Sequence, residues 1–423
     1  MSVADLAIVA ALVFGWGTLS ARLERFDVTA PIAFVLAGLL LTHGPLAVLG
    51  FTPSDELIKT LAEFTLALVL FSDASRVGLH ELRADSDLDL RLLGVALPLT
   101  IALGTVLALA LTGTSIWLAL LVGAALAPTD AALGAGMMAN PVVPARIRRL
   151  INVESGLNDG IATPFVSVAI AGVAGGHGHG PAAAVAELAV GVLVGVAVGG
   201  VGGLLVSAAR RRGWAAEGFG GAAVLGLAVC AYASSVALHG NGFIAAFVAG
   251  LAYGTAGGRR GEPLVPFVEE TGALVSLLVW LAFGAVALVP AVESLTWQML
   301  LYAVLSLTVV RMAPVLVALV GARLDWATSL LVAWFGPRGL ASVVFALLAL
   351  EELGSPTAGP AVAVISITVV ISIVAHGATA EPLATRYANR LARPAGGAGA
   401  QLPDVPDRRL IRHATRRGIT PQG

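Results

Sequence analysis

The sequence predicts an all-α polytopic membrane protein from its composition, its long apolar segments and the placement of its basic residues. Of the 423 residues, 57% are apolar and 12% are charged, against roughly 25% charged in an average soluble protein. Mean hydropathy is +0.90. A soluble domain of this size could not bury so much apolar surface, whereas lipid can cover it. This composition excludes a disordered chain, a nucleic-acid-binding protein and an ordinary soluble enzyme.

Thirteen segments are predicted as membrane-spanning helices, each of which needs about 20 apolar residues to cross a bilayer. The second and the ninth are short, so we expect them to be tilted, kinked or extended into the following loop. The predicted spans are residues 3–21, 29–42, 54–72, 90–111, 115–139, 147–171, 182–208, 217–237, 241–256, 263–288, 298–320, 326–352 and 358–385.

The basic residues fall on one side of the membrane when the chain crosses it thirteen times. With the C-terminus in the cytoplasm and the N-terminus outside, 22 of the 25 lysines and arginines lie in cytoplasmic segments or at the cytoplasmic ends of spans, and none lies in an outer loop. The other three, Lys59, Arg311 and Arg338, are inside predicted helices. This positive-inside asymmetry predicts a multi-pass protein of the cell membrane with that orientation.

Five charged residues lie deep in predicted spans, where an ionised side chain costs at least about 2.5–3.5 kcal/mol and therefore suggests a function. Three are acidic and two are basic, which leaves one uncompensated negative charge. That balance suits a site that holds one proton or one monovalent cation. The five residues are Asp130, Glu154, Asp159, Arg311 and Arg338.

Two predicted spans carry sequences that interrupt a helix. In the fifth span Pro128 precedes Asp130 within APTDA, and in the twelfth span Pro337 precedes Arg338 within FGPRGLAS. Proline removes a backbone N–H and clashes with the preceding turn. If the two interruptions cross, Asp130 would face helix N-termini and Arg338 would face helix C-termini, which suits their charges. Interrupted helices in both halves of a chain are typical of transporters with inverted repeats. The alternative is a simple proline kink that Asp130 caps.

The sixth span carries a polar face within INVESGLNDGIATP. Glu154 and Asn158 are four residues apart, as are Ser155 and Asp159, so both pairs lie on one side of a helix. Carboxylate, hydroxyl and amide oxygens suit hard cations rather than thiophilic metals. A purely structural explanation would need a buried partner for each of these groups.

Arg311, in the eleventh span, cannot lose its proton and therefore needs an acidic partner. Glu154 is the natural candidate, and this pairing leaves Asp159 free to bind a proton or a cation. The assignment rests on charge balance alone.

Other polar residues allow more than one interpretation. Asp73 ends the third predicted span, where it either reaches the site or is an interfacial acid near Arg76. Lys59 and Glu63 are four residues apart near the outer end of that span, and we expect them to form a structural pair. His376 is expected to be a packed or capping residue.

These motifs resemble the monovalent cation:proton antiporter-1 family, the NhaP/NHE type of sodium/proton antiporters, over roughly residues 1–390. The resembling pieces are APTDA, ESGLNDG, the mid-membrane Arg311, FGPRGLAS and the closing AHGATAEP. The resemblance implies thirteen helices with two crossed broken helices among them. It places a core bundle within 90–171 and 298–385, dimer-forming interface helices within 1–72 and 182–288, and a short cytoplasmic tail, expected to be disordered, at 391–423.

Carried over residue by residue, the resemblance implies a Na⁺ site. Asp159 is similar to the carboxylate that binds both the cation and the proton, and Asn158 resembles its partner. Thr129 and Ser155 resemble supporting ligands, and Asp130 resembles the acid at the crossing point.

The resemblance also implies roles outside the ligand set. Glu154 and Arg311 resemble the family's buried ion pair, and Arg338 is the base of the second interruption. Asp73 falls where some members place a further site acid. Ala131 departs from the family, because many members have proline there.

The expected function is exchange of Na⁺, or of K⁺ or Li⁺, for H⁺ at one shared carboxylate, without a cofactor, by a homodimer in the lipid bilayer. Only Asp159 is left to change protonation, which predicts electroneutral exchange of one cation per proton. An intramembrane aspartyl protease with Asp130 and Asp159 as its dyad is an alternative from another class, but the expected Gly-x-Gly-Asp sequence is absent. A passive channel would not need a titratable acid between two interrupted helices.

Overall fold

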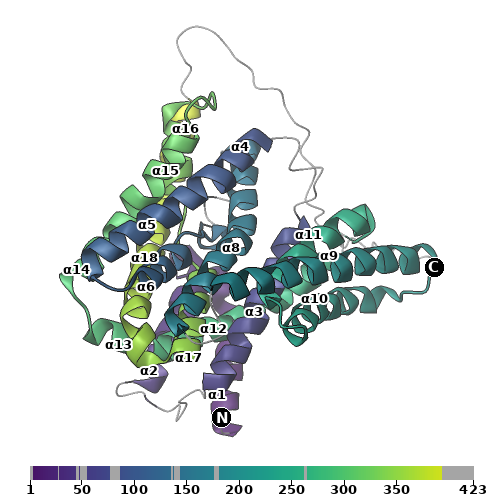
Figure 1. Cartoon of the computed structure of the whole chain (residues 1–423). Helices are drawn as coiled ribbons and strands as arrows, with labels where there is room; N and C mark the ends of the chain where they lie inside the picture. The colour runs from purple at the N-terminus through teal and green to yellow at the C-terminus, as the bar shows by residue number, and fades with distance from the viewer. Residues whose placement is uncertain are drawn as a thin grey trace, which may run out of the picture.

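The computed structural model describes residues 3–26, 28–43, 47, 55–76, 86–134, 137, 143–175, 181–261 and 264–392. All regular secondary structure within these residues is helical (Figure 1). By length and composition, eight helical stretches among them can cross a membrane, and three shorter apolar helices accompany them. The prediction of an all-α membrane protein is therefore confirmed.

Three helices open the chain. Pro31 lies in the first turn of α2, where its missing N–H leaves no hydrogen bond unmade. α2 packs against α12, and α3 packs against both α11 and α12. α3 continues beyond residue 72, the predicted end, so Asp73 lies within the helix. The bounds are α1 (Val3–Leu23), α2 (Ala30–Thr42) and α3 (Asp55–Arg76).

The second group of helices contains the first interruption. α4 runs into α5 through a π-helical turn, Leu92–Ala96. α6 starts after Ser115, whose side chain accepts a hydrogen bond from the N–H of Leu118. α6 stops at Ala125, and a 3₁₀ turn follows at Ala131–Gly134. The bounds are α4 (Ser86–Arg91), α5 (Leu97–Thr112), α6 (Ile116–Ala125) and α8 (Ala145–Ala174).

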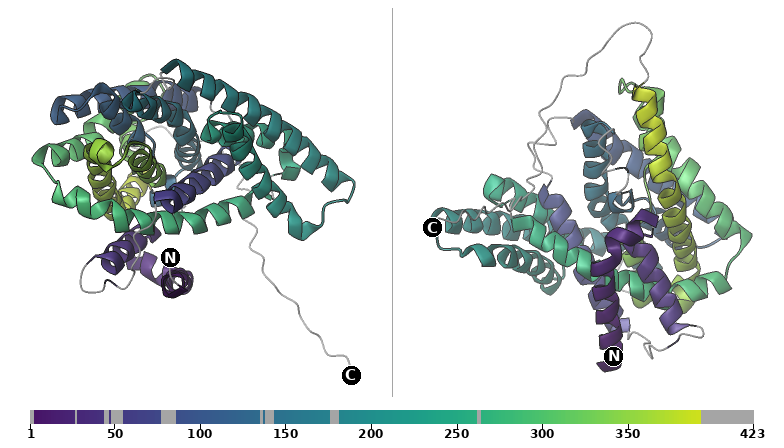
Figure 2. Two further views of the ribbon diagram at one scale, coloured as in Figure 1. Left: turned by 60° about the horizontal axis from the view of Figure 1, so that its bottom comes forward. Right: turned by 180° about the vertical axis from the view of Figure 1, so that it is seen from behind.

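The third group lies to one side of the molecule, where α9, α10 and α11 pack together (Figures 1 and 2). A Cβ atom on Gly195 of α9 would stand 2.7 Å from the carbonyl oxygen of Ala245 on α11. Small residues therefore let these two backbones approach closely, as is usual between membrane helices. The bounds are α9 (Pro181–Arg211), α10 (Gly220–Ala237), α11 (Gly242–Gly261), α12 (Val265–Val286) and α13 (Leu288–Glu293).

The last group repeats the element order of the second. α14 joins α15 through another π-helical turn, Ser306–Val310. The chain then leaves the helical conformation at residues 335–339, between α16 and α17, and a long helix, α18, follows. The bounds are α14 (Trp297–Leu305), α15 (Arg311–Ala318), α16 (Trp326–Trp334), α17 (Leu340–Leu353) and α18 (Ser355–Ala392).

The tail predicted at 391–423 lies outside the described residues, except for its first two residues, which belong to α18.

The largest buried cluster joins helices from both halves of the chain. Leu66 of α3, Leu121 of α6, Val344 of α17 and Ile365 of α18 all belong to it and are almost fully buried. Many apolar side chains on the outer faces are exposed instead, and they include Leu193 and Leu204 of α9. Such a surface suits a bilayer. The buried cluster includes residues of α6 and α17, the helices next to the two interruptions.

Candidate functional site

The first interruption contacts the second directly. Pro128 cannot donate the hydrogen bond that would continue α6. The N–H of Asp130 instead donates to the carbonyl oxygen of Pro337 at 2.8 Å. One oxygen of the Asp130 carboxylate accepts from the N–H of Leu340 at 3.2 Å. Leu340 is the first residue of α17, so this negative charge lies at a helix N-terminus, where the helix dipole favours it.

Arg338 occupies the opposite electrostatic position. Its side chain is fully buried, and the guanidinium donates to the carbonyl oxygens of Ala127 and Gly336 at 3.3 Å and of Pro128 at 3.4 Å. It also reaches the carbonyl oxygen of Ser306, within the π-helical turn, at 3.5 Å. These carbonyls follow the ends of α6 and α16 or lie in the π-helical turn, where helical partners are missing. The guanidinium therefore satisfies backbone acceptors from three segments.

Two glycines of the second interruption allow this close approach. A Cβ atom on Gly339 would overlap the carboxylate of Asp130. A Cβ atom on Gly336 would stand 2.5 Å from Nε of Arg311 and 2.9 Å from the methyl group of Thr129. Neither position has room for a side chain, so FGPRGLAS needs glycine on both sides of Pro337 and Arg338 for steric reasons.

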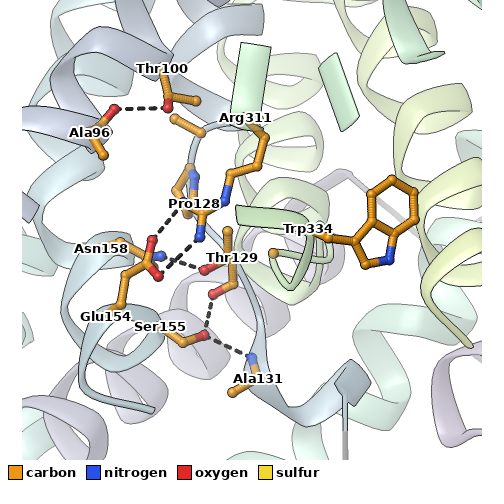
Figure 3. A network of polar contacts seen from close by, with 12 residues as sticks. Ala96, Thr100, Pro128, Thr129, Ala131, Glu154, Ser155, Asn158, Arg311 and Trp334 are labelled. Atoms are coloured by element: carbon orange, nitrogen blue, oxygen red, sulfur yellow. Dashed lines mark hydrogen bonds and ion pairs between the residues drawn. The ribbon is translucent and has the colours of Figure 1, made fainter. Parts of the chain in front are cut away.

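Glu154 and Arg311 form a two-pronged ion pair (Figure 3). The guanidinium nitrogens donate to the two carboxylate oxygens at 2.5 and 3.0 Å. The side chains are 3% and 2% exposed, so the pair is withdrawn from water. Arg311 directly follows the π-helical turn, and such turns are frequent at functional sites. The two residues assigned to each other from charge balance are thus in contact.

α8 holds the first interruption through hydroxyl and amide groups (Figure 3). The hydroxyl of Ser155 donates to the carbonyl oxygen of Thr129 and accepts from the N–H of Ala131 at 2.7 Å. Asn158 donates its side-chain N–H to the Thr129 hydroxyl at 2.8 Å. Asn158 is almost fully buried, and its side chain points at Thr129. Its side-chain oxygen has no partner among the described residues.

A cavity of about 1170 Å³ adjoins this network. Its lining includes the predicted site residues Asp73, Asp130 and Asp159, together with Thr129 and Ser155. The three acids are near enough to repel one another electrostatically. Within the described chain, however, no three acidic, histidine or cysteine side chains converge closely enough to form a preformed metal cluster. The three carboxylates therefore line one cavity, but they do not converge on a single ion position.

The position of Asp73 follows from the packing of α3 on α8. A Cβ atom on Gly156 would lie 3.4 Å from the Cβ of Asp73, so the glycine of ESGLND leaves space beside this acid. Asp73 lines the same cavity as Asp159, and Arg76 lines it too.

The cavity reaches the surface near the end of α3. Arg76 and Glu269 form an ion pair there, and both side chains are 43% exposed. Glu24, Arg149 and Glu381 also line the cavity. The cavity that the three acids line therefore includes exposed charged side chains at this end of the molecule.

The expected pair of Lys59 with Glu63 is wrong. The Lys59 ammonium contacts Glu351 at 2.9 Å and Glu352 at 2.7 Å, because the end of α17 packs beside α3. Glu63 lies beside Tyr232 of α10 and is attracted by the Lys59 charge without forming an ion pair with it. Sequence spacing within one helix could not reveal partners that the fold brings from elsewhere.

Sequence reasoning also missed two serines. The hydroxyl of Ser372 accepts from the N–H of Arg338 at 2.7 Å, and the hydroxyl of Ser342 donates to the carbonyl oxygen of Ala125 at 2.6 Å. Each therefore satisfies a backbone group at one interruption. The feature of the sequence that could have indicated them is a serine within an otherwise apolar segment.

Two contacting helix interruptions, opposite charges at their ends and an acid-lined cavity define a helical membrane protein of the secondary-transporter class. A family model described as sodium/hydrogen exchanger, transmembrane, matches residues 8–386. The chain therefore belongs to the sodium/hydrogen exchanger family, whose members are transporters.

Individual relatives agree with this family. Proteins named as uncharacterized Na⁺/H⁺ exchangers of Mycobacterium bovis and Mycobacterium tuberculosis are 30% identical over 215 residues, which is 49% of this chain. The match spans only 36% of the length of those relatives. Two structures of the sodium proton antiporter MjNhaP1 from Methanocaldococcus jannaschii superpose with TM-scores of 0.72 and 0.71. They cover 91% of this chain and 98% of theirs at 16% and 19% identity, and they show the shared fold.

Proposed function

We propose that this chain exchanges a monovalent cation, Na⁺ or its relatives K⁺ and Li⁺, for H⁺ at a site centred on Asp159. One observation carries the proposal. Asp159 lines the acidic cavity, and among the described residues no group hydrogen-bonds to its carboxylate or forms an ion pair with it. The buried Glu154, by contrast, is engaged by Arg311. Asp159 is therefore the deep carboxylate of α8 that can exchange a proton for a cation.

The ligand chemistry of the cavity supports a hard monovalent ion as the transported substrate. Carboxylate oxygens of Asp159, Asp130 and Asp73 share the space with Ser155 and Thr129, and oxygen ligands prefer hard cations. The hydroxyls of Ser155 and Thr129 are engaged with each other's segments, so in this conformation they position the interruption. Cation and proton compete for Asp159, and each binds when the other has left.

Alternating access would move a core bundle within 90–171 and 298–385 against interface helices within 1–72 and 182–288. The contacts of Asp130 with Pro337 and of Arg338 with Ala127 support two interrupted helices that cross at the site. The repeated order of π-turn helix, interrupted helix and long helix supports an inverted repeat. We further propose thirteen crossings in all and assembly as a homodimer in the cell membrane.

The orientation of the cavity follows from the predicted topology. Arg76 and Arg149 line the cavity, and they lie at the end of α3 and near the start of α8, which the positive-inside rule assigns to the cytoplasm. The N-terminus would lie outside and the C-terminus inside, so the conformation described would be open to the cytoplasm.

The test is cation-dependent proton flux in proteoliposomes that contain the purified chain. Asp159→Asn removes the titratable group while keeping the shape of the side chain, so the protein should fold and exchange should be lost. Asp87→Asn is the matched control, because the Asp87 side chain is 76% exposed and pairs only with Arg91 among the described residues. Full exchange by a folded Asp159→Asn protein would refute the proposal.

A further inference from the structure

The second interruption is clamped by a buried histidine and a buried serine of α18. The hydroxyl of Ser372 accepts from the backbone N–H of Arg338 at 2.7 Å. One helical turn further on, Nε2 of His376 lies 3.1 Å from the carbonyl oxygen of Trp334. Trp334 ends α16 and Arg338 immediately precedes the Gly339 cap of α17. The two side chains therefore bond to the backbone on both sides of the interruption.

The chemistry of these contacts is directional. A carbonyl oxygen only accepts, so the contact with Trp334 is a hydrogen bond in the tautomer that carries its proton on Nε2, and in that tautomer Nδ1 accepts from the Ser372 hydroxyl. On the other side of the ring, Nδ1 lies 3.2 Å from the Ser372 hydroxyl and 2.9 Å from the Ser372 carbonyl oxygen. The ring therefore links the end of α16 to the same serine that holds Arg338, and the network spans the whole interruption.

Packing holds the imidazole in this position. His376 is 1% exposed, and its ring stacks on the Trp334 ring with centroids 5.1 Å apart and planes 27° apart. The indole N–H of Trp334 donates to the hydroxyl of Thr379 at 3.1 Å. The tryptophan is thus bound through its ring, its indole N–H and its backbone carbonyl to one helix, α18.

The clamped segment presents two groups to the ion site. The carbonyl oxygen of Pro337 accepts from the N–H of Asp130, and the N–H of Leu340 donates to the Asp130 carboxylate. A shift of the backbone between Trp334 and Leu340 would move Asp130 relative to Asp159. Loss of cation affinity is the expected result, because ligand sets tolerate only small displacements.

We propose that His376, acting with Ser372, is a positioning residue for cation binding, because it holds the backbone of the second interruption at the spacing that Asp130 requires. This inference rests on the proposed exchange function for its kinetic consequence. Its structural consequence, a backbone held by two side-chain hydrogen bonds, can be measured independently of transport.

The experiment compares three variants of the full chain with a control. His376→Leu removes both ring contacts, Ser372→Ala removes the bond to Arg338, and His376→Gln can still place an N–H donor near the position of Nε2. Thr368→Val is the control, since the buried Thr368 hydroxyl bonds only to Val364 of its own helix. Each protein is measured for amide hydrogen exchange over residues 334–341 and for the apparent KM for Na⁺ in proteoliposomes.

We expect His376→Leu and Ser372→Ala to speed amide exchange at residues 334–341 and to raise the KM for Na⁺ by about two- to tenfold, the range set by one lost hydrogen bond. The double variant should raise KM less than the product of the two single effects, because both residues serve one network. His376→Gln should stay within about twofold of the parent, and Thr368→Val should change neither quantity.

Unchanged amide exchange and an unchanged KM in folded His376→Leu would overturn the inference. So would His376→Gln behaving like His376→Leu, because ring packing rather than the donated hydrogen bond would then matter. Lower yield with a normal KM would mean a purely structural role and would also overturn it. If the parent protein shows no exchange at all, the proposed function fails, while the amide-exchange comparison still decides whether the clamp exists.

Discussion

The backbone N–H of Asp130 donates to the carbonyl oxygen of Pro337 at 2.8 Å, so two helix interruptions from opposite halves of the chain share a hydrogen bond. The bond leaves the Asp130 carboxylate beside the first N–H of α17 and brings the Arg338 guanidinium to the carbonyl of Ala127. Asp130 of the first interruption therefore places a negative charge at the N-terminus of α17, and Arg338 of the second places a positive charge beyond the C-terminus of α6. A substitution in one interruption should therefore alter the geometry of the other.

The first prediction concerns Gly339. A Cβ atom added to Gly339 would overlap the Asp130 carboxylate. Gly339→Ala should therefore keep the helical content, lower the stability by about 1–3 kcal/mol, a typical cost of overpacking, and raise the KM for Na⁺ because the Asp130 carboxylate must move. The measurement is the KM for Na⁺ in proteoliposomes. Gly359→Ala is the control, because nothing lies within 4 Å of its added Cβ. Equal KM values for the two variants would contradict the prediction.

The second prediction concerns the buried pair of Glu154 and Arg311. Glu154→Gln or Arg311→Ala leaves one charge buried without its partner, which typically costs about 3–5 kcal/mol. Thermal unfolding in detergent should therefore shift strongly downward. Lys59→Gln is the matched control. It breaks two ion pairs whose side chains are 22–48% exposed, and such pairs contribute only about 0–1 kcal/mol each. A fully stable Glu154→Gln protein with altered cation affinity alone would move Glu154 into the binding site.

The third prediction concerns the ratio of cations to protons. If Asp159 is the single carrier, the same charge moves in both directions, and the exchange rate should not respond to an imposed potassium-diffusion potential. Asp73 lines the same cavity and is the residue that would carry a second proton. A rate that follows the imposed voltage would show that more than one proton moves per cation. Asp73→Asn would then remove the voltage dependence if Asp73 is the second carrier.

The fourth prediction concerns pH. Protonation of Asp159 and cation binding to it exclude each other, so lowering the pH should raise the KM for Na⁺ and leave the maximal rate reachable at high Na⁺. Initial rates over a matrix of Na⁺ concentration and pH test this competition. A maximal rate that falls with pH at a constant KM would instead point to a proton site separate from the cation site.

The extent to which the sequence anticipates the structure differs between local and long-range features. The positions of Pro128 and Pro337 predict where helices stop, because a missing N–H acts within one turn. Spacing within one helix likewise predicts that Ser155 and Asp159 share a face. The same reasoning failed for Lys59, since its carboxylate partners come from α17 and not from its own helix.

By itself, the sequence determined the class of protein, its all-helical character and the short list of charged residues inside apolar segments. Apolar length, proline chemistry and the cost of burying charge act on local stretches of chain, so they can be read without coordinates. Only the tertiary structure decided that Asn158 turns toward Thr129, that Asp73 lines the cavity with Asp159, and that Ser372 and His376 hold the second interruption. These contacts join residues on different helices, and their geometry depends on how the helices pack, which no local pattern encodes.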